Sequence, residues 1–200
     1  EGSWTSGGTL PGGLTVSGLF WADDRFVLYA LLGTNRMRYS LNGTTWTNVT
    51  ESGIGNGLNI GMTKCDDGRY VVGQNGNFRH TPNSNMTSWV NVTVSGAGQL
   101  RHVVDTPTRF ALYTPGTSIV YRYLKSNPAS GAGHNMGTNR NIVGKGHYRA
   151  VSNRLSILLG WTAFPTRHVR FDPSASGIPS WEYIDRGVAE GATILCSTGN

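Results

Sequence analysis

Cysteine, acidic residues and long apolar runs are all scarce in this sequence. Its only cysteines, Cys65 and Cys196, form no C-x-x-C or Cys/His cluster, which argues against a disulfide framework and against a zinc site. The two thiols can pair only if the ends of the chain meet. No apolar run approaches the ~18 to 20 residues of a membrane helix, and the amino terminus lacks a signal-peptide pattern. We expect no membrane insertion, no metal and no cofactor.

Charge is low and weighted to the basic side. Charged residues make up 14% of the chain, with 17 Lys plus Arg against 11 Asp plus Glu and a formal net charge of +6. The excess indicates an anionic partner, while the alternative is that a modest positive charge only keeps the protein in solution. Long runs of like charge are missing, so we expect no nucleic-acid partner.

Glycine is abundant, at 28 of 200 residues, which disfavours long helices and favours short strands joined by tight turns. The segment 37–46 predicts one such β-hairpin. Its residues alternate as in a strand up to Tyr39, Asn42-Gly43 predicts a two-residue turn, and Trp46 is expected to begin the return strand.

The hairpin recurs along the chain. Copies of it begin at Phe78, Tyr121 and Val169, and the copy at Tyr121 has lost its tryptophan. A second landmark, a strand followed by a polar turn and another strand, repeats every 40 to 45 residues and aligns Phe26, Tyr70, Phe110 and Leu155. In the second copy, four short strands are expected at 60–64, 70–73, 77–80 and 89–94.

Four short strands at this spacing are typical of propeller blades, which bury their faces only against neighbouring blades. We therefore predict an all-β fold, a β-propeller of four-stranded antiparallel blades. Five blades with a composite last blade are expected, and a four-bladed ring or a fragment of a larger ring is the alternative. The predicted parts of this single domain are a closing strand at 1–13, repeats at 14–53, 54–97, 98–142 and 143–187, and the start of a final blade at 188–200. Because the chain begins at Glu1, we expect a piece of a longer protein.

Two stretches carry a resemblance to a known family. Residues 67–76, Asp-Gly-Arg-Tyr-Val-Val-Gly-Gln-Asn-Gly, and residues 39–46, Tyr-Ser-Leu-Asn-Gly-Thr-Thr-Trp, resemble the repeats of sialidase-like, Asp-box-containing β-propellers. They are also similar to propeller modules of bacterial surface proteins and phage tail proteins. Asn42 stands where that family usually has aspartate, and the turn is one residue shorter. In the family this motif is a structural turn, so the resemblance implies the fold and no active site.

A sialidase resemblance would require three arginines on the substrate carboxylate, a tyrosine nucleophile with a glutamate partner, and an aspartate acid/base. Glycoside hydrolysis generally needs two carboxylates at a fixed separation. The glutamates are only Glu1, Glu51, Glu182 and Glu190, and most aspartates stand in predicted turns. We therefore predict that the protein is not an enzyme and has no catalytic residues, and a glycosidase is the minority alternative.

One arginine stands at the centre of each hairpin copy. These arginines are Arg38, Arg79, Arg122 and Arg170. Because side chains alternate across a strand, we expect the four to occupy the same place in every blade and to form a ring. They either bind anionic sugars or phosphates, or pack between blades and bind turn carbonyls, and the second role is favoured.

Loops supply the other candidates. Trp161 opens an insertion, 161–166, followed by Arg167 and His168, where an exposed aromatic ring could stack on a sugar. The long connection 125–145 contributes His134 and Asn139, unless it is an ordinary flexible link. The repeated tryptophans are expected to pack between blades, and they are Trp4, Trp46, Trp89 and Trp181.

Together these patterns predict a non-catalytic, lectin-like binding module. We expect it to recognise a cell-surface glycan or receptor, with an anionic ligand as one candidate, as part of a larger phage tail or receptor-binding protein or a bacterial surface protein. The expected location is extracellular or on a virion surface. The alternative is a propeller with a structural or protein-interaction role in a larger assembly.

Overall fold

The computed structural model describes part of the chain. The described residues are 16–30, 37–49, 61–82, 84, 86–114, 117, 119–135, 140–142, 147–149, 154–161, 164–171 and 182–184. All structural statements below concern these residues, and side chains are considered only as far as Asn135. Every strand pairing among them is antiparallel, so the described part is all-β. The described residues contain no helix long and apolar enough to cross a membrane.

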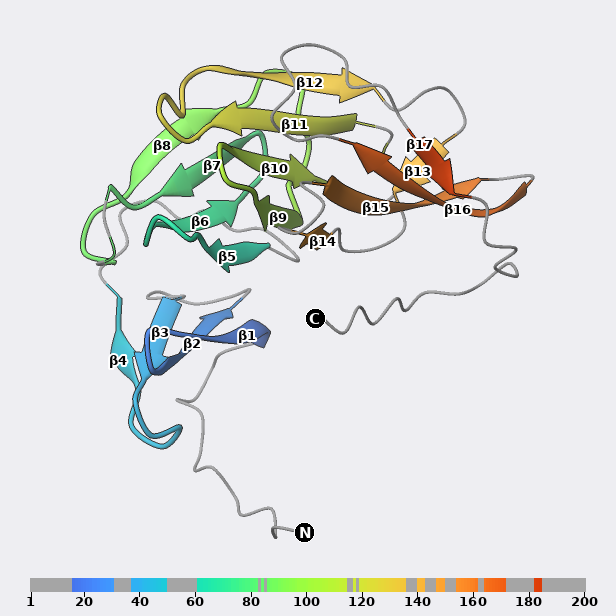
Figure 1. Cartoon of the computed structure of the whole chain (residues 1–200). Helices are drawn as coiled ribbons and strands as arrows, with labels where there is room; N and C mark the ends of the chain where they lie inside the picture. Colours follow the sequence, from blue (N-terminus) through green and yellow to red (C-terminus); the bar gives the residue numbers. More distant parts are fainter. Residues whose placement is uncertain are drawn as a thin grey trace, which may run out of the picture.

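Three four-stranded sheets follow one another along the chain (Figure 1). Sheet 1 has the order β1 (Val16–Ala22), β2 (Arg25–Ala30), β3 (Met37–Ser40) and β4 (Thr47–Asn48). Sheet 2 has the order β5 (Met62–Lys64), β6 (Tyr70–Gly73), β7 (Asn77–His80) and β8 (Val90–Thr93). Sheet 3 contains β9 (His102–Asp105), β10 (Arg109–Tyr113), β11 (Ile119–Leu124) and β12 (Gly131–Asn135). In each sheet, strands that are consecutive in sequence are neighbours, as expected for blades.

Sheet 4 departs from this plan because two strands share one neighbour. Its strands are β13 (Arg140–Ile142), β14 (His147–Arg149), β15 (Arg154–Trp161), β16 (Phe164–Phe171) and β17 (Glu182–Ile184). β13 pairs with the end of β15 and β14 pairs with its beginning, so the first strand of the sheet is divided into two. β13 therefore belongs to sheet 4, although it falls inside the predicted repeat 98–142.

The four strands predicted for the second copy are confirmed. The observed strands of sheet 2 coincide with the predicted ones at β6 and β7 and lie within them at β5 and β8. The hairpin 37–46 is confirmed as a pair of strands, but its turn is longer than predicted. β3 ends at Ser40 and β4 begins only at Thr47, with Tyr39 paired to Thr47. The prediction of a two-residue Asn42-Gly43 turn is therefore wrong.

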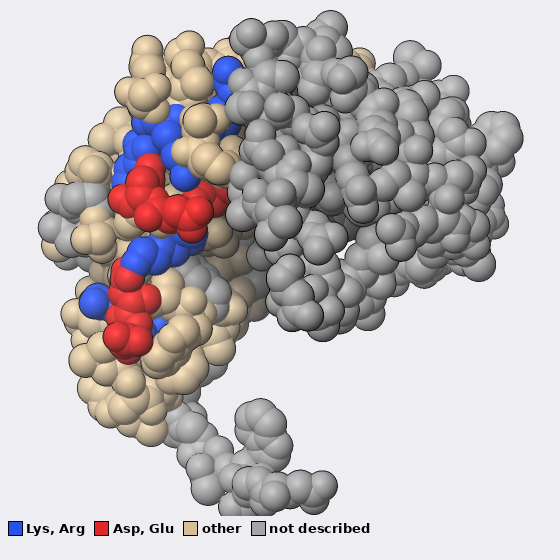
Figure 2. All heavy atoms as spheres, viewed as in Figure 1, with Lys and Arg blue, Asp and Glu red and all other residues tan. Residues whose placement is uncertain are grey.

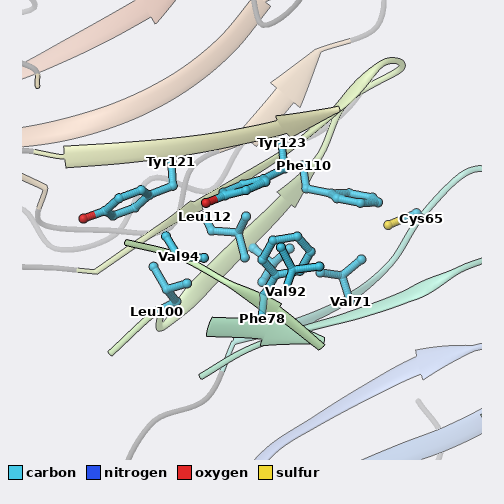
Figure 3. Close-up of a cluster of buried hydrophobic side chains, with 11 residues drawn as sticks. Cys65, Val71, Phe78, Val92, Val94, Leu100, Phe110, Leu112, Tyr121 and Tyr123 are labelled. Atoms are coloured by element: carbon cyan, nitrogen blue, oxygen red, sulfur yellow. The ribbon is translucent and has the colours of Figure 1, made fainter. Parts of the chain in front are cut away.

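Neighbouring sheets stack face to face and share apolar cores. The core between sheets 1 and 2 contains Ala22, Val27, Met37, Val49, Met62, Tyr70, Val72, Met86 and Trp89. The core between sheets 2 and 3, drawn in Figure 3, contains Cys65, Val71, Phe78, Val92, Val94, Leu100, Val103, Phe110, Leu112, Tyr121 and Tyr123. Sheet 2 thus buries both of its faces, which a single four-stranded sheet cannot do alone.

The first strand of sheet 3 lies next to strands of sheets 2 and 4. β9 of sheet 3 contacts both β5 of sheet 2 and β14 of sheet 4. This arrangement is consistent with blades whose first strands surround a common axis. The predicted closing strand 1–13 and the predicted final blade at 188–200 lie outside the described residues.

Sheet 3 lacks the tryptophan of the other copies, and its outer strand, β12, packs against two tyrosine rings instead. Tyr123 pairs with Gly131, and Tyr121 pairs with Gly133. A Cβ on Gly131 would lie 2.4 Å from the Tyr123 ring, and one on Gly133 would lie 2.9 Å from the Tyr121 ring. The two rings therefore lie against the backbone of β12, in the space that glycine leaves open.

The turn between β3 and β4 is held by two polar side chains. Oδ1 of Asn42 accepts hydrogen bonds from the backbone N–H groups of Thr44 (3.0 Å) and Thr45 (2.9 Å) and from the hydroxyl of Ser40 (3.1 Å). Oγ of Ser40 accepts the N–H of Gly43 at 2.9 Å, and Gly43 has a positive φ of 74°. Only the oxygen of Asn42 takes part in these bonds, so asparagine does here what aspartate does in the motif it resembles.

This geometry predicts opposite outcomes for two substitutions of Asn42. Asn42→Ala removes the acceptor of three hydrogen bonds and is expected to lower the free energy of unfolding by about 1 to 2 kcal/mol. Asn42→Asp keeps the acceptor and is expected to change it by less than about 0.5 kcal/mol. Urea unfolding of both variants measures the difference. Equal stability of Asn42→Ala and Asn42→Asp would show that the side chain does not hold the turn.

Candidate functional site

The four repeated arginines do not form one ring, because their register differs between sheets. Arg38 pairs with Leu28 and Arg79 pairs with Val72. Leu28 and Val72 each lie two residues after the aligned positions Phe26 and Tyr70.

In sheets 3 and 4, the residue that pairs with the arginine lies only one residue after the aligned position. Arg122 pairs with Ala111, one residue after Phe110, and Arg170 pairs with Ser156, one residue after Leu155. A shift of one residue moves a side chain to the opposite face of its sheet. The prediction that the arginines occupy the same place in every sheet is therefore wrong, and Tyr121 is the residue of sheet 3 that corresponds to Arg38 and Arg79.

Each of the three arginines with a described side chain has a different environment. Nε of Arg79 donates a hydrogen bond to the side-chain oxygen of Gln74 at 3.3 Å. Nε of Arg38 is buried and finds no hydrogen-bond partner among the described residues. Arg122 is only 2% exposed, and Nη2 lies 3.0 Å from Nε2 of His134. Of these candidates, Arg122 and His134 are brought together by the structure.

Arg122 and His134 lie on the face of sheet 3 that points away from sheet 2. The guanidinium donates to Nε2 of the imidazole, which requires that nitrogen to be unprotonated. Burial lowers the pKa of His134 below its ordinary value, and the positive charges of Arg122 and Arg109 lower it further. His134 is therefore a neutral acceptor at pH 7, beside two guanidinium groups that attract anions.

The lowered pKa of His134 makes stability depend on pH. The folded state binds its proton less tightly than the unfolded state, so stability is complete above the unfolded pKa of ~6.5 and falls as the pH drops below it. His134→Gln keeps an acceptor for Arg122 without titrating. From pH 7 to pH 5, the free energy of unfolding is expected to fall in both proteins, and the fall in this variant should be smaller by up to about 1 kcal/mol. Urea unfolding at both pH values tests this, and identical pH dependence would contradict it.

The other sequence-predicted ligand residues lie in sheet 4 or outside the described residues. Trp161 ends β15, and Arg167 and His168 lie within β16, paired with Leu159 and Leu158. Trp161 and residues 164–166 of the predicted insertion therefore belong to two paired strands. The connection 125–145 likewise contains β12, with His134 in it, and β13. Asn139 lies outside the described residues, as do Trp4 and Trp181.

The described tryptophans have different exposures. Trp89 is 9% exposed and lies in the core between sheets 1 and 2, as predicted. Trp46 is half-buried. Trp21, which stands outside the repeated series, is 56% exposed and makes an edge contact with Phe26 at a ring-centre distance of 4.6 Å.

Charged side chains gather at one end of the sheets, where the turns β1–β2, β5–β6 and β9–β10 lie. We call this set the charged edge, and it comprises Asp23, Lys64, Asp66, Asp67, Arg69, Asp105 and Lys125. Figure 2 shows basic and acidic groups side by side on the described part of the surface. The carboxylate of Asp23 in sheet 1 forms an ion pair with the ammonium of Lys64 and accepts a hydrogen bond of 2.6 Å from the hydroxyl of Tyr70. Lys64 and Tyr70 both belong to sheet 2. The charged edge therefore joins sheet 1 to sheet 2.

The same edge joins sheet 2 to sheet 3. Asp105 lies 2.7 Å from the ammonium of Lys125 and accepts the backbone N–H of Asp66 at 2.8 Å. Nη2 of Arg69 donates to the backbone carbonyl of Lys125 at 2.9 Å and also binds Asp67. Burial raises the pKa of Asp105 above its ordinary value, although Lys125 and the N–H of Asp66 oppose the shift.

The chemistry of this edge is structural rather than nucleophilic. The Cys65 thiol lies beside Asp105, and burial together with that negative charge raises its pKa far above the ordinary value, so the reactive thiolate does not form at neutral pH. Burial also raises the pKa of Asp67, but the hydrogen bonds and charge of Arg69 outweigh it and leave the pKa below the ordinary value. Among the described residues, no group of three or more His, Cys, Asp or Glu side chains could hold a metal ion.

Sequence reasoning missed the charged edge because several of its contacts join different repeats. Asp23 and Lys64, for example, are separated by a whole repeat. The available signal was the recurrence of aspartate in the turns after β1 and β5. The scan against family models and the search of curated proteins found no match for this chain.

Proposed function

We propose that this protein is a non-catalytic binding domain that recognises an anionic glycan or a glycan-bearing receptor on a cell surface. It acts as part of a larger phage tail protein or bacterial surface protein, in an extracellular location or on a virion. The stacked sheets provide a rigid scaffold, and the ligand binds at side chains carried by that scaffold. This proposal rests on the distribution of ion pairs and on the excess of basic residues over the whole chain.

The single observation that carries the proposal is an imbalance in ion pairing. Three of the described aspartates, Asp23, Asp67 and Asp105, pair with cations of the charged edge. By contrast, four described arginines make no ion pair with any described carboxylate, and they are Arg25, Arg38, Arg101 and Arg109. Guanidinium groups without a carboxylate partner among the described residues are suited to carboxylates or phosphates of a ligand.

The same distribution is unfavourable for a glycosidase. Hydrolysis of a glycosidic bond generally needs one carboxyl group as an acid and a second as a base or nucleophile. Asp23 and Asp105 each have a cation and a hydrogen-bond donor from a neighbouring strand or sheet, so neither is available to take up or deliver a proton. We therefore propose binding without cleavage.

A glycan array with matched acidic and neutral oligosaccharides tests this function. We expect acidic glycans to bind in preference to their neutral counterparts, with affinity that falls as salt increases. Arg167→Gln and Trp161→Ala are expected to weaken binding of a hit about tenfold or more. Lys64→Gln, which removes one positive charge from a cation that is already paired with Asp23, is the control and is expected to bind normally. Equal binding of acidic and neutral glycans would contradict an anionic ligand.

A second function, docking into a larger protein assembly, is favoured by a different observation. Sheet 1 exposes several large apolar side chains, with Leu19 at 57%, Trp21 at 56% and Leu41 at 67% exposed. An apolar surface of this kind is usually covered, either by another protein or by another segment of the same chain. A protein that binds no glycan in the array but forms a stable complex with a neighbouring part of its parent protein would support this second function.

A further inference from the structure

The exposed apolar side chain Leu19 of sheet 1 stands at a position that is buried in sheets 2 and 3. Leu19 pairs with Leu28, just as Met62 pairs with Val72 and Val103 pairs with Leu112. The three first-strand residues are therefore equivalent. Met62 is 7% exposed and Val103 is 2% exposed, whereas Leu19 is 57% exposed.

The burial of the equivalent residues comes from the preceding sheet. Met62 belongs to the core shared with sheet 1, and Val103 belongs to the core shared with sheet 2. Trp21 is equivalent to Lys64 of sheet 2 and Asp105 of sheet 3. Each of these two residues contacts the preceding sheet, Lys64 through Asp23 and Asp105 through Asp66. Sheet 1 therefore carries a face built to be covered by a preceding sheet.

The chain itself contains a segment with the right pattern. Residues 191–197, Gly-Ala-Thr-Ile-Leu-Cys-Ser, align with the first strand of sheet 2, with Cys196 at the position of Cys65. They follow the last described strand, β17, and seven extended residues span about 23 Å, the length of the seven-residue β1. No charged residue occurs in 191–197, as expected for a strand buried on both faces.

We propose that residues 191–197 dock as a strand on the exposed face of sheet 1 and supply the sheet that precedes it. The alignment also predicts the contact. Cys65 lies beside Asp105 of the following sheet, so Cys196 lies beside Trp21, the equivalent of Asp105. Because alternate residues of a strand share a face, Ile194 points to the same face as Cys196 and covers Leu19.

Cysteine crosslinking in the full-length chain tests this contact. Trp21→Cys places a thiol where Cys196 is expected, and Leu19→Cys places one a step further along β1. Under mild oxidation or with a short thiol-to-thiol crosslinker, we expect a bond to Cys196 within one molecule, detected by mass spectrometry of the digest. The matched control is Val90→Cys, an exposed position (45%) on the outer strand of sheet 2. We expect crosslinking at least about tenfold above this control, because the docked thiols have a much higher effective concentration.

Each other outcome would overturn the proposal. Crosslinks between two molecules would show that a second copy covers the face. Crosslinking of Trp21→Cys and Leu19→Cys no greater than that of Val90→Cys would show that residues 191–197 do not dock there. Hydrogen exchange gives an independent readout: deletion of residues 188–200 is expected to speed amide exchange in β1 and to leave β7 and β11 unchanged. Unchanged exchange in β1 would contradict the docking.

Discussion

Gly73→Ala is expected to lower the free energy of unfolding by about 2 to 3 kcal/mol, because the methyl group has no room. A Cβ at Gly73 would lie 2.3 Å from the backbone carbonyl oxygen of Leu100 and 3.0 Å from the Leu100 side chain. The N–H of Gly73 also binds the carbonyl of Gly61 at 2.9 Å, so the strand cannot move away without losing a hydrogen bond. Leu100 is 1% exposed and belongs to the core between sheets 2 and 3.

Gly98→Ala is the matched control, since it makes the same chemical change where space is open. A Cβ at Gly98 meets nothing within 4 Å, and the residue does not have a positive φ. Its unfolding free energy is expected to stay within about 0.5 kcal/mol of the wild type. Chemical unfolding of both variants measures the contrast. If Gly73→Ala were as stable as Gly98→Ala, the connection between β8 and β9 that contains Leu100 would not pack against sheet 2 as closely as described.

Lys125→Met is expected to cost about 2 to 3 kcal/mol at pH 7, because it leaves Asp105 buried without its cation. The side chains of this pair are only 8% and 12% exposed. The control is Lys64→Met, which makes the same change in the more exposed pair with Asp23 (25% and 29%) and is expected to cost less than about 1 kcal/mol. Asp105→Asn combined with Lys125→Met removes both charges and is expected to recover part of the loss.

The pH dependence of Lys125→Met follows from the raised pKa of Asp105. In the folded state, Asp105 holds a proton more tightly than in the unfolded chain, so stability increases as the pH falls through the folded pKa towards the ordinary value of ~3.8. Removing Lys125 raises that pKa further. The stability gap between Lys125→Met and the wild type should therefore narrow between pH 7 and pH 5. A gap that stays constant or widens on acidification would show that an unpaired Asp105 is not the cause.

Much of the fold could be predicted from the repeat. Strand periodicity and the spacing of the aligned landmark placed the strands of sheet 2 within two residues of where they lie, because local alternation and turn residues determine where strands start and stop. Because a small sheet can bury its faces only against neighbouring sheets, the shared apolar cores could also be predicted. The role of Asn42 in its turn also followed from the sequence, although the length of that turn did not.

Register and contacts between repeats were harder to predict. Arg122 sits in the same sequence context as Arg79, yet a one-residue difference in pairing puts it on the opposite face, where it meets His134. Nothing local in the sequence encodes that shift, since register depends on turn geometry and on which face each partner buries. The contacts of Asp23 and Asp105 with a neighbouring sheet could not be predicted either, because they depend on how two sheets pack together and not on the local sequence.

Mass spectrometry of bound glycans tests the central claim, binding without catalysis, most directly. Each acidic glycan retained in the array is incubated with the full chain, and its mass is followed over time. The account predicts a ligand that binds reproducibly and is recovered unchanged, since Asp23, Asp67 and Asp105 are held by cations of the charged edge. Release of a shortened glycan, lost on substitution of a carboxylate, would contradict the account and establish a glycosidase.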